Sequence, residues 1–176
     1  MLPLKGMSLT RADKVAPGHL VLCDNDSEWE LALRIQAHDP DASDLHGLMP
    51  FRRPLPASSA LGPVVHFGYD DTRCVDLGIP HFAWTADIAR LGAVTPSRNR
   101  PGPLLLRKET ISIAAATPPA YGLTWWNLAD GTKAAQSLRD FVIEHWALGL
   151  PDVDGNFQTV LRFPEDFAAG ASGTAA

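Results

Sequence analysis

Residues 121–163, YGLTWWNLADGTKAAQSLRDFVIEHWALGLPDVDGNFQTVLRF, carry the clearest fold signal in this chain. Residues 121–128 are rich in aromatic and β-compatible side chains, which pack well on a pleated sheet. Residues 157–163 alternate between the two faces of a half-buried strand. Between these runs apolar side chains recur at helical spacing, at Ala135, Leu138, Phe141, Val142 and Trp146. The stretch therefore predicts a strand, a long helix over about 132–148, and a second strand.

Residues at both ends of this helix support the prediction. Asp130 or Thr132 can cap the free amide groups at its start. Gly149 can adopt the left-handed conformation that ends helices, and Pro151 cannot continue one. The strand–helix–strand unit is compatible with a parallel crossover and equally with a helix packed across an antiparallel sheet.

Strand signals continue toward the N-terminus. Residues 19–23 form a short apolar run, residues 24–27 are turn-forming, and residues 29–37 alternate between apolar and polar side chains. These features predict a hairpin whose second strand has one dry face. Further strands are expected at 64–69 and 104–114, with a short helix over 82–92.

The order of these elements predicts the fold class. Sequential strands joined by short turns favour antiparallel pairing. We therefore expect an α+β fold: a mostly antiparallel curved sheet or small β-barrel, with one long late helix (about 132–148) packed on it. The expected organisation is a flexible N-terminal arm over 1–15, a single domain over 16–165 and a flexible C-terminal tail over 166–176.

The composition is that of a globular protein, because 45% of the 176 residues are hydrophobic and 20% are charged. The formal net charge of −5 argues against a general nucleic-acid binder, since neutralising phosphates takes a basic surface. No apolar run approaches the roughly 20 residues that span a bilayer, and the first residues lack the apolar core of a signal peptide. The expected location is the cytoplasm, or a virion if the chain comes from a phage.

The richest polar cluster lies between residues 66 and 81. His66, Asp71, Cys74 and His81 are residue types that bind metals or build a nucleophile–base pair, so they are the candidate catalytic residues. Their spacing matches no standard zinc or thiol-protease pattern. The alternative is a strand that ends in an acidic turn, with Cys74 as a small core residue. Because Cys23 and Cys74 are the only cysteines, we expect free thiols rather than a disulfide framework.

Two further groups are candidate binding residues. Arg52 and Arg53 lie in the Pro-rich loop 51–56, whose polyproline-like character suits docking into an aromatic groove. Trp125 and Trp126 place one indole on each face of their strand, so that one of them could be exposed on a binding surface. The alternative is that both indoles belong to the core. A phosphate-binding patch would form if the fold brings Arg52 and Arg53 close to a second group of basic residues, Arg98, Arg100, Arg107 and Lys108.

Cofactor motifs do not occur in the sequence. There is no G-x-G-x-x-G or G-x-x-x-x-G-K phosphate loop and no G-x-S-x-G nucleophile elbow. Residues 152–156 resemble the start of a calcium loop, but the twelfth position, counted from Asp152, is Phe163 rather than an acidic ligand. A turn is therefore predicted at 152–156. No cofactor and no metal site is therefore expected.

Three hypotheses for function follow from these observations. The first, which we favour, is a non-enzymatic interaction or structural assembly protein that binds protein partners or copies of itself, such as a subunit of a larger complex or a phage particle. The second is a small hydrolase or nuclease that uses His66 to His81. The third is a small β-barrel that binds nucleic acid or a peptide, because residues 17–22, PGHLVL, followed by the strand that begins at Trp29, resemble the opening of an SH3-like barrel.

Overall fold

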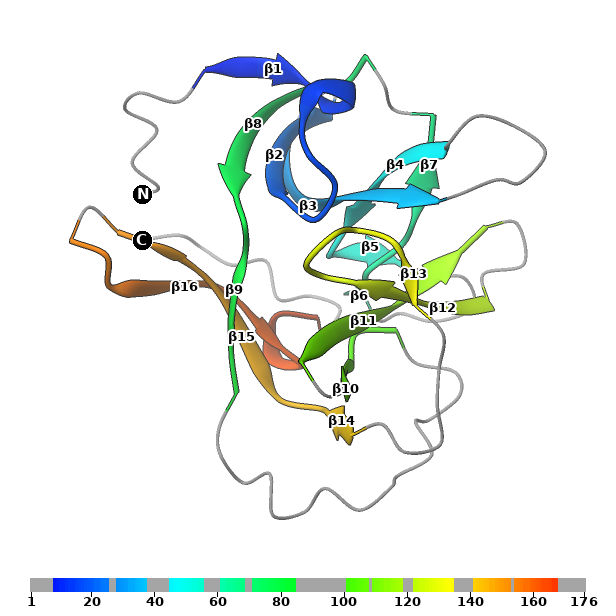
Figure 1. The fold of residues 1–176 in the computed structure, drawn as a ribbon, viewed down its shortest axis with the longest axis vertical. Helices are drawn as coiled ribbons and strands as arrows, with labels where there is room; N and C mark the ends of the chain where they lie inside the picture. The colour runs from blue at the N-terminus through cyan, green and yellow to red at the C-terminus, as the bar shows by residue number, and fades with distance from the viewer. Residues whose placement is uncertain are drawn as a thin grey trace.

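The chain is built mainly from antiparallel β-sheets (Figure 1). The computed structural model describes residues 8–25, 28–37, 45–55, 61–68, 71–84, 101–107, 109–118, 122–134, 141–152 and 154–167. Helical structure among these residues is confined to two 3-10 turns, η1 (Ala12–Lys14) and η3 (Glu165–Phe167). No helix in the described part of the chain is long and apolar enough to cross a membrane.

The first sheet has six strands in the order β1-β8-β2-β3-β4-β7. The expected hairpin is confirmed, because β2 and β3 pair from Leu20 opposite Leu33 to Asn25 opposite Glu28. The strands of this sheet are β1 (Leu9–Arg11), β2 (Leu20–Asn25), β3 (Glu28–Ala37), β4 (Leu45–Pro50), β7 (His66–Phe67) and β8 (Arg73–Gly78).

The second sheet has five strands in the order β13-β12-β11-β10-β14. Its members are β10 (Leu104–Arg107), β11 (Thr110–Thr117), β12 (Gly122–Asn127), β13 (Lys133–Ala134) and β14 (Phe141–Ile143). The expected single strand over 104–114 is instead a hairpin, in which Arg107 pairs with Thr110. The Thr110 hydroxyl donates a hydrogen bond to the Arg107 carbonyl at 2.8 Å and so holds the reversal.

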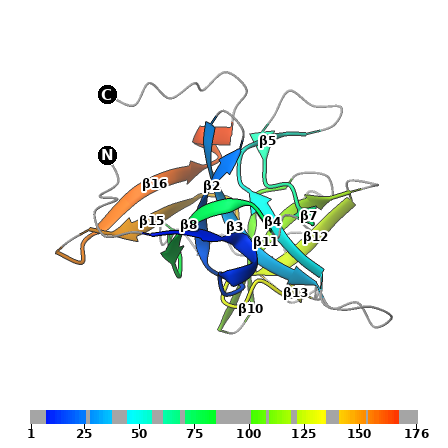
Figure 2. The same cartoon turned by 90° about the horizontal axis from the view of Figure 1, so that it is seen from above.

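The third sheet has three strands in the order β16-β15-β9. They are β9 (His81–Ala83), β15 (Trp146–Pro151) and β16 (Phe157–Phe163), and a separate pair is formed by β5 (Arg53–Pro54) and β6 (Leu61–Gly62). Figure 1 shows that β9 continues the path of β8, so one run of chain leads from the first sheet into the third. Figure 2 places β15 and β16 at one side of the molecule, with β12 and β13 at the other.

All three sheets contribute to one hydrophobic core. Trp126 is 1% exposed and Leu148 is fully buried, although they come from different sheets. Two parallel bridges add to these connections: Gln36 of β3 pairs with Thr132, the residue before β13, and Val64, between β6 and β7, pairs with Ala116 of β11. The core also contains Leu20, Leu33, Ile35, Met49, Phe51, Val65, Leu104, Ile113, Ala115, Leu128, Ile143, Trp146, Leu150, Leu161, Phe163 and Phe167.

The predicted α+β fold with a long late helix is wrong. Within 132–148 the structure has β13, β14 and the start of β15, while residues 135–140 lie outside the described residues. The expected small barrel is also wrong, because none of the described sheets closes on itself. The short helix expected over 82–92 begins on Phe82, which belongs to β9, and residues 85–92 lie outside the described residues.

Local chemistry explains the error. Asp130 accepts hydrogen bonds from the amide and the hydroxyl of Thr132, at 2.9 and 2.6 Å, as a helix cap would. Here these bonds close the turn between β12 and β13, in which Gly131 has a φ of +66°. The same side-chain-to-backbone bonds serve turns and helix starts, so the cap signal did not discriminate between them. After it, Trp146, Leu148 and Leu150 face the core with the period of two that a strand requires.

Candidate functional site

A groove lies over the third sheet, on the side that faces away from the core. Side chains alternate along β15, so Trp146 and Leu148 are buried while Ala147 points outward. Ala147 pairs with Ala83 of β9 on one side and with Arg162 of β16 on the other. The two alanines leave a shallow floor, and the groove above it has a volume of about 390 Å³.

Aromatic side chains form the walls of this groove. Phe157, at the start of β16, is 43% exposed, and Trp84, directly after β9, is half-buried. The Phe157 ring lies on the backbone of Gly149, where an added Cβ would come within 2.4 Å of a ring carbon. Glycine at this position therefore lets the ring approach the backbone of β15 closely, while Phe157 remains partly exposed to solvent.

Polar side chains complete the rim. Arg162, His145 and Glu165 line the groove, and the His145 Nδ1 and Glu165 Oε1 atoms lie 3.9 Å apart. Both of these side chains are largely exposed, so their interaction contributes little to stability and leaves them available to a ligand. The Asp166 carboxylate accepts the Arg162 backbone amide at 2.6 Å and ties η3 to the end of β16. Aliphatic, aromatic and charged groups thus meet within one groove.

The candidate catalytic residues do not form one site. Cys74 lies in β8 and His66 in β7, and three strands separate them, which corresponds to roughly 19 Å along the sheet. His81 is exposed on β9 of the third sheet. A nucleophile and its base must lie within hydrogen-bond reach, so these side chains do not supply such a pair.

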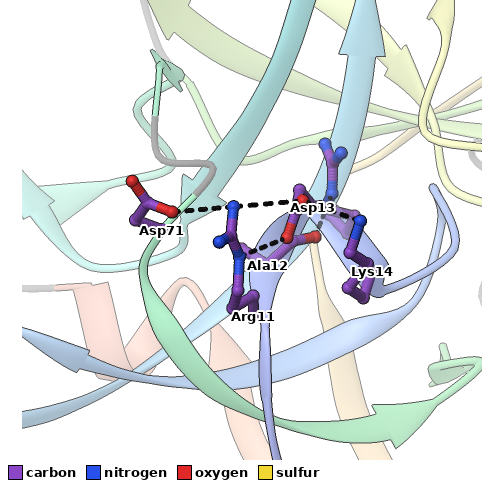
Figure 3. A network of polar contacts seen from close by, with 6 residues as sticks. Arg11, Ala12, Asp13, Lys14 and Asp71 are labelled. Atoms are coloured by element: carbon purple, nitrogen blue, oxygen red, sulfur yellow. Dashed lines mark hydrogen bonds and ion pairs between the residues drawn. The ribbon is translucent and has the colours of Figure 1, made fainter.

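Asp71 takes part in a surface network that holds the first described segment of the chain (Figure 3). Its carboxylate lies 2.7 Å from Nη2 of Arg11, whose Nε lies 3.0 Å from the Asp13 carboxylate. Asp13 also lies 3.2 Å from the Lys14 ammonium. Because the Asp71 side chain is 88% exposed, its ion pair is expected to contribute weakly to stability. Its observed role is to connect β1 with the turn before β8.

The candidate arginines differ in their surroundings. Arg53 lies 2.5 Å from Glu30 in an ion pair that is largely shielded from solvent. Arg52, the preceding residue, is half-buried. Of the other residues of the proposed phosphate patch, Arg107 is exposed at the end of β10, whereas positions 98, 100 and 108 lie outside the described residues.

Trp125 and Trp126 are both buried, on opposite faces of β12. Trp126, 1% exposed, belongs to the main core. Trp125, 6% exposed, packs with Leu105 and Ala114 on the outer face of the second sheet. Neither indole therefore presents an open binding surface.

Sequence reasoning did not identify the residues of the groove. Phe157 and Arg162 were assigned to a half-buried strand, and Trp84 to the start of a short helix. The available signal was the two small residues Ala147 and Gly149, which alternate with larger ones in β15 beside the alternating β16. These residues form a groove only because β9 pairs with the other side of β15. In the described residues, no group of three or more His, Cys, Asp or Glu side chains is arranged to hold a metal ion.

His66 provides a prediction about pH. Burial, followed by the nearby positive charge of Arg53, lowers the pKa of His66. The folded state therefore binds this proton less readily than the unfolded state, so its contribution to stability is present above the ordinary histidine pKa and is lost as the pH falls. Urea unfolding at about pH 7.5 and pH 5, on either side of the ordinary value of about 6.5, should show a larger loss of stability for the wild type than for His66→Gln. Equal losses in both proteins would contradict the prediction.

Comparison with known proteins does not assign this chain to a family. No protein-family model matches the chain, and no curated protein or solved structure matches it significantly.

Proposed function

We propose that this protein is a non-enzymatic interaction protein, a subunit that binds another protein through the groove over β9, β15 and β16. The observation that carries the proposal is the groove itself, about 390 Å³ in volume, with an alanine floor, the walls of Phe157 and Trp84 and a charged rim. Exposed aromatic residues and arginine are enriched in protein interfaces and contribute most of their binding energy.

The geometry suits an extended segment of the partner. Ala147 of β15 lies between Ala83 of β9 and Arg162 of β16, so an extended segment can lie along the groove above it. An apolar side chain of the partner would pack between Phe157 and Trp84. A carboxylate one or two residues away would meet the guanidinium of Arg162. The net charge of −5 for the whole chain favours a protein partner over nucleic acid.

Peptide selection tests this proposal. Random linear peptides are selected on the folded wild-type protein, and the enriched peptides are titrated by fluorescence anisotropy. They should combine an aromatic or aliphatic residue with an acidic one. Replacing Phe157 by alanine should weaken their binding about tenfold or more, because a buried aromatic contact is lost. Amide shifts in NMR spectra should map to β9, β15 and β16.

Phe141 provides a matched control. It is also 43% exposed, but it lies on β14 in the second sheet. Phe141→Ala should leave the affinity nearly unchanged, and both variants are compared only after their thermal unfolding has been measured. Arg162→Glu, which keeps the floor and walls intact, should also weaken binding. Equal affinities for wild type, Phe157→Ala and Arg162→Glu would refute the groove as the binding site.

A further inference from the structure

Cys23 and Cys74 face each other across two neighbouring strands of the first sheet. Cys23 of β2 is the direct register partner of Cys74 of β8. Residues directly opposite each other in an antiparallel pair have Cα atoms about 4.5 or 5.5 Å apart, and their side chains lie on the same face. Both distances fall within the range of about 4.4–6.8 Å that a disulfide spans. The backbone thus already has the spacing that a cross-strand disulfide requires.

The two thiols differ in their readiness to react. A hydrogen bond between them, together with burial, raises the pKa of Cys23. The same hydrogen bond lowers the pKa of Cys74, and the positive charge of Arg34 acts in the same direction, although burial and Asp76 oppose it. The thiolate is the reactive form of cysteine. The lowered pKa of Cys74 favours it as the attacking sulfur, with Cys23 keeping its proton until the second step.

A short segment covers the pair. Cys23 is 4% exposed and Cys74 is fully buried, in a small cluster that includes Ala12 and Val15 from η1 and the residue after it. The Ala12 amide donates a hydrogen bond to the Thr72 carbonyl at 2.9 Å. The Ala12 carbonyl accepts a hydrogen bond from the guanidinium of Arg34. Short segments can open locally at a lower free-energy cost than global unfolding. Such an opening would admit a small reagent without unfolding the sheet.

We propose that Cys23 and Cys74 are a reversible redox site, which a low-molecular-weight disulfide oxidises to a cross-strand disulfide. The Cys74 thiolate attacks one sulfur of the reagent, whose S–S bond breaks and releases one small thiolate. Cys23 then gives its proton to solvent and attacks the Cys74 sulfur, which releases the second small thiolate. Two electrons pass from the protein to the reagent. The site lies in the first sheet and does not depend on the groove over the third.

Mass spectrometry of the wild-type protein tests this proposal. The full chain is equilibrated in glutathione buffers of rising disulfide content, quenched with acid, alkylated and analysed without reduction. We expect a monomer that has lost two hydrogens, with the Cys23 and Cys74 peptides linked. A reducing buffer should reverse the change. Circular dichroism at the same buffer compositions should report an unchanged fold.

Single substitutions separate the two sulfurs. Alanine is used because the surrounding cluster is apolar. Cys23→Ala should stop at a glutathione adduct on Cys74, whereas Cys74→Ala should form an adduct on Cys23 roughly tenfold more slowly or not at all. If either variant fails to fold, the peptide map of the wild type still tests the proposal. Disulfide-linked dimers, adducts without ring closure in the wild type, or oxidation that needs added urea would each overturn it.

Discussion

Trp146→Ala is expected to lower the free energy of unfolding by about 3–5 kcal/mol, the usual cost of removing a buried tryptophan. The indole is 4% exposed and contacts three phenylalanine rings. It stacks on Phe163 with ring centres 5.5 Å apart and meets Phe82 and Phe167 edge-on, so it joins all three strands of the third sheet to η3. Urea unfolding followed by circular dichroism measures the loss.

The hydrogen bond of this indole can be tested separately. Its Nε1 donates to the Gly102 carbonyl at 2.9 Å, and Gly102, with a φ of +117°, lies so close to the Phe163 ring that an added Cβ would be 2.1 Å from it. Trp146→Phe keeps a ring but leaves that carbonyl without its donor, so a smaller loss of about 1–3 kcal/mol is expected. Trp29→Ala is the matched control, because Trp29 is 52% exposed. A loss for Trp29→Ala as large as that for Trp146→Ala would contradict this account.

Arg34→Met is expected to lower the free energy of unfolding by about 2–4 kcal/mol, because buried carbonyl groups lose their donor. Arg34 is 1% exposed. Its Nε donates to the Ala12 carbonyl at 2.8 Å, and its Nη1 donates to the carbonyls of Gly47, at 3.1 Å, and Ile35. The guanidinium thus ties η1 to the middle of the first sheet, and urea unfolding measures what this contributes.

Hydrogen exchange separates this role from a general loss of stability. The Ala12 amide donates a hydrogen bond to the Thr72 carbonyl. Relative to the wild type, Arg34→Met should speed up exchange of this amide more than exchange of amides in the middle of β3. Arg34→Lys keeps the charge but not the planar fork, so an intermediate loss is expected. Arg73→Met is the matched control, because Arg73 is exposed on the same sheet and lies directly opposite Arg11. No loss in Arg34→Met, or an equal loss in Arg73→Met, would contradict the prediction.

Several strands and turns could be predicted from the sequence. The β2–β3 hairpin was anticipated from the turn-forming residues 24–27 and the alternating run after them, and the strand over 157–163 is β16. The predicted turn at 152–156 is confirmed, because the Asp152 side chain accepts the amides of Asp154 and Asn156 at 2.9 and 2.8 Å. These elements depend on residues that are close in the chain, which is why the local pattern was sufficient.

The late helix could not be excluded on the same basis. Apolar residues at 135, 138, 141, 142 and 146 fit a helical face, but a short apolar pattern fits a strand as well. The outcome depended on partners elsewhere in the chain, since β14 pairs with β10 and β15 pairs with both β9 and β16.

Burial on the polar side of β3 and the candidate site both depended on residues that are distant in the chain. The strand from Trp29 to Ala37 was expected to have one dry face, yet Ala32 and Arg34 on its polar side are buried beneath Ala12 and Leu48. Likewise, the groove arises because β9 reaches β15 from far along the chain.

The sequence alone determined four features: the turn-forming residues, the alternation of the strands, the net negative charge and the presence of only two cysteines. Each of them depends on composition or on a few neighbouring residues. The order of strands within the sheets, the burial of Arg34, the register that sets Cys23 opposite Cys74 and the groove beside Phe157 arose only on folding. The physical reason is that strand pairing is a contact between residues far apart in the chain. Many pairings satisfy the same alternation, and packing of the three sheets around one core selects among them.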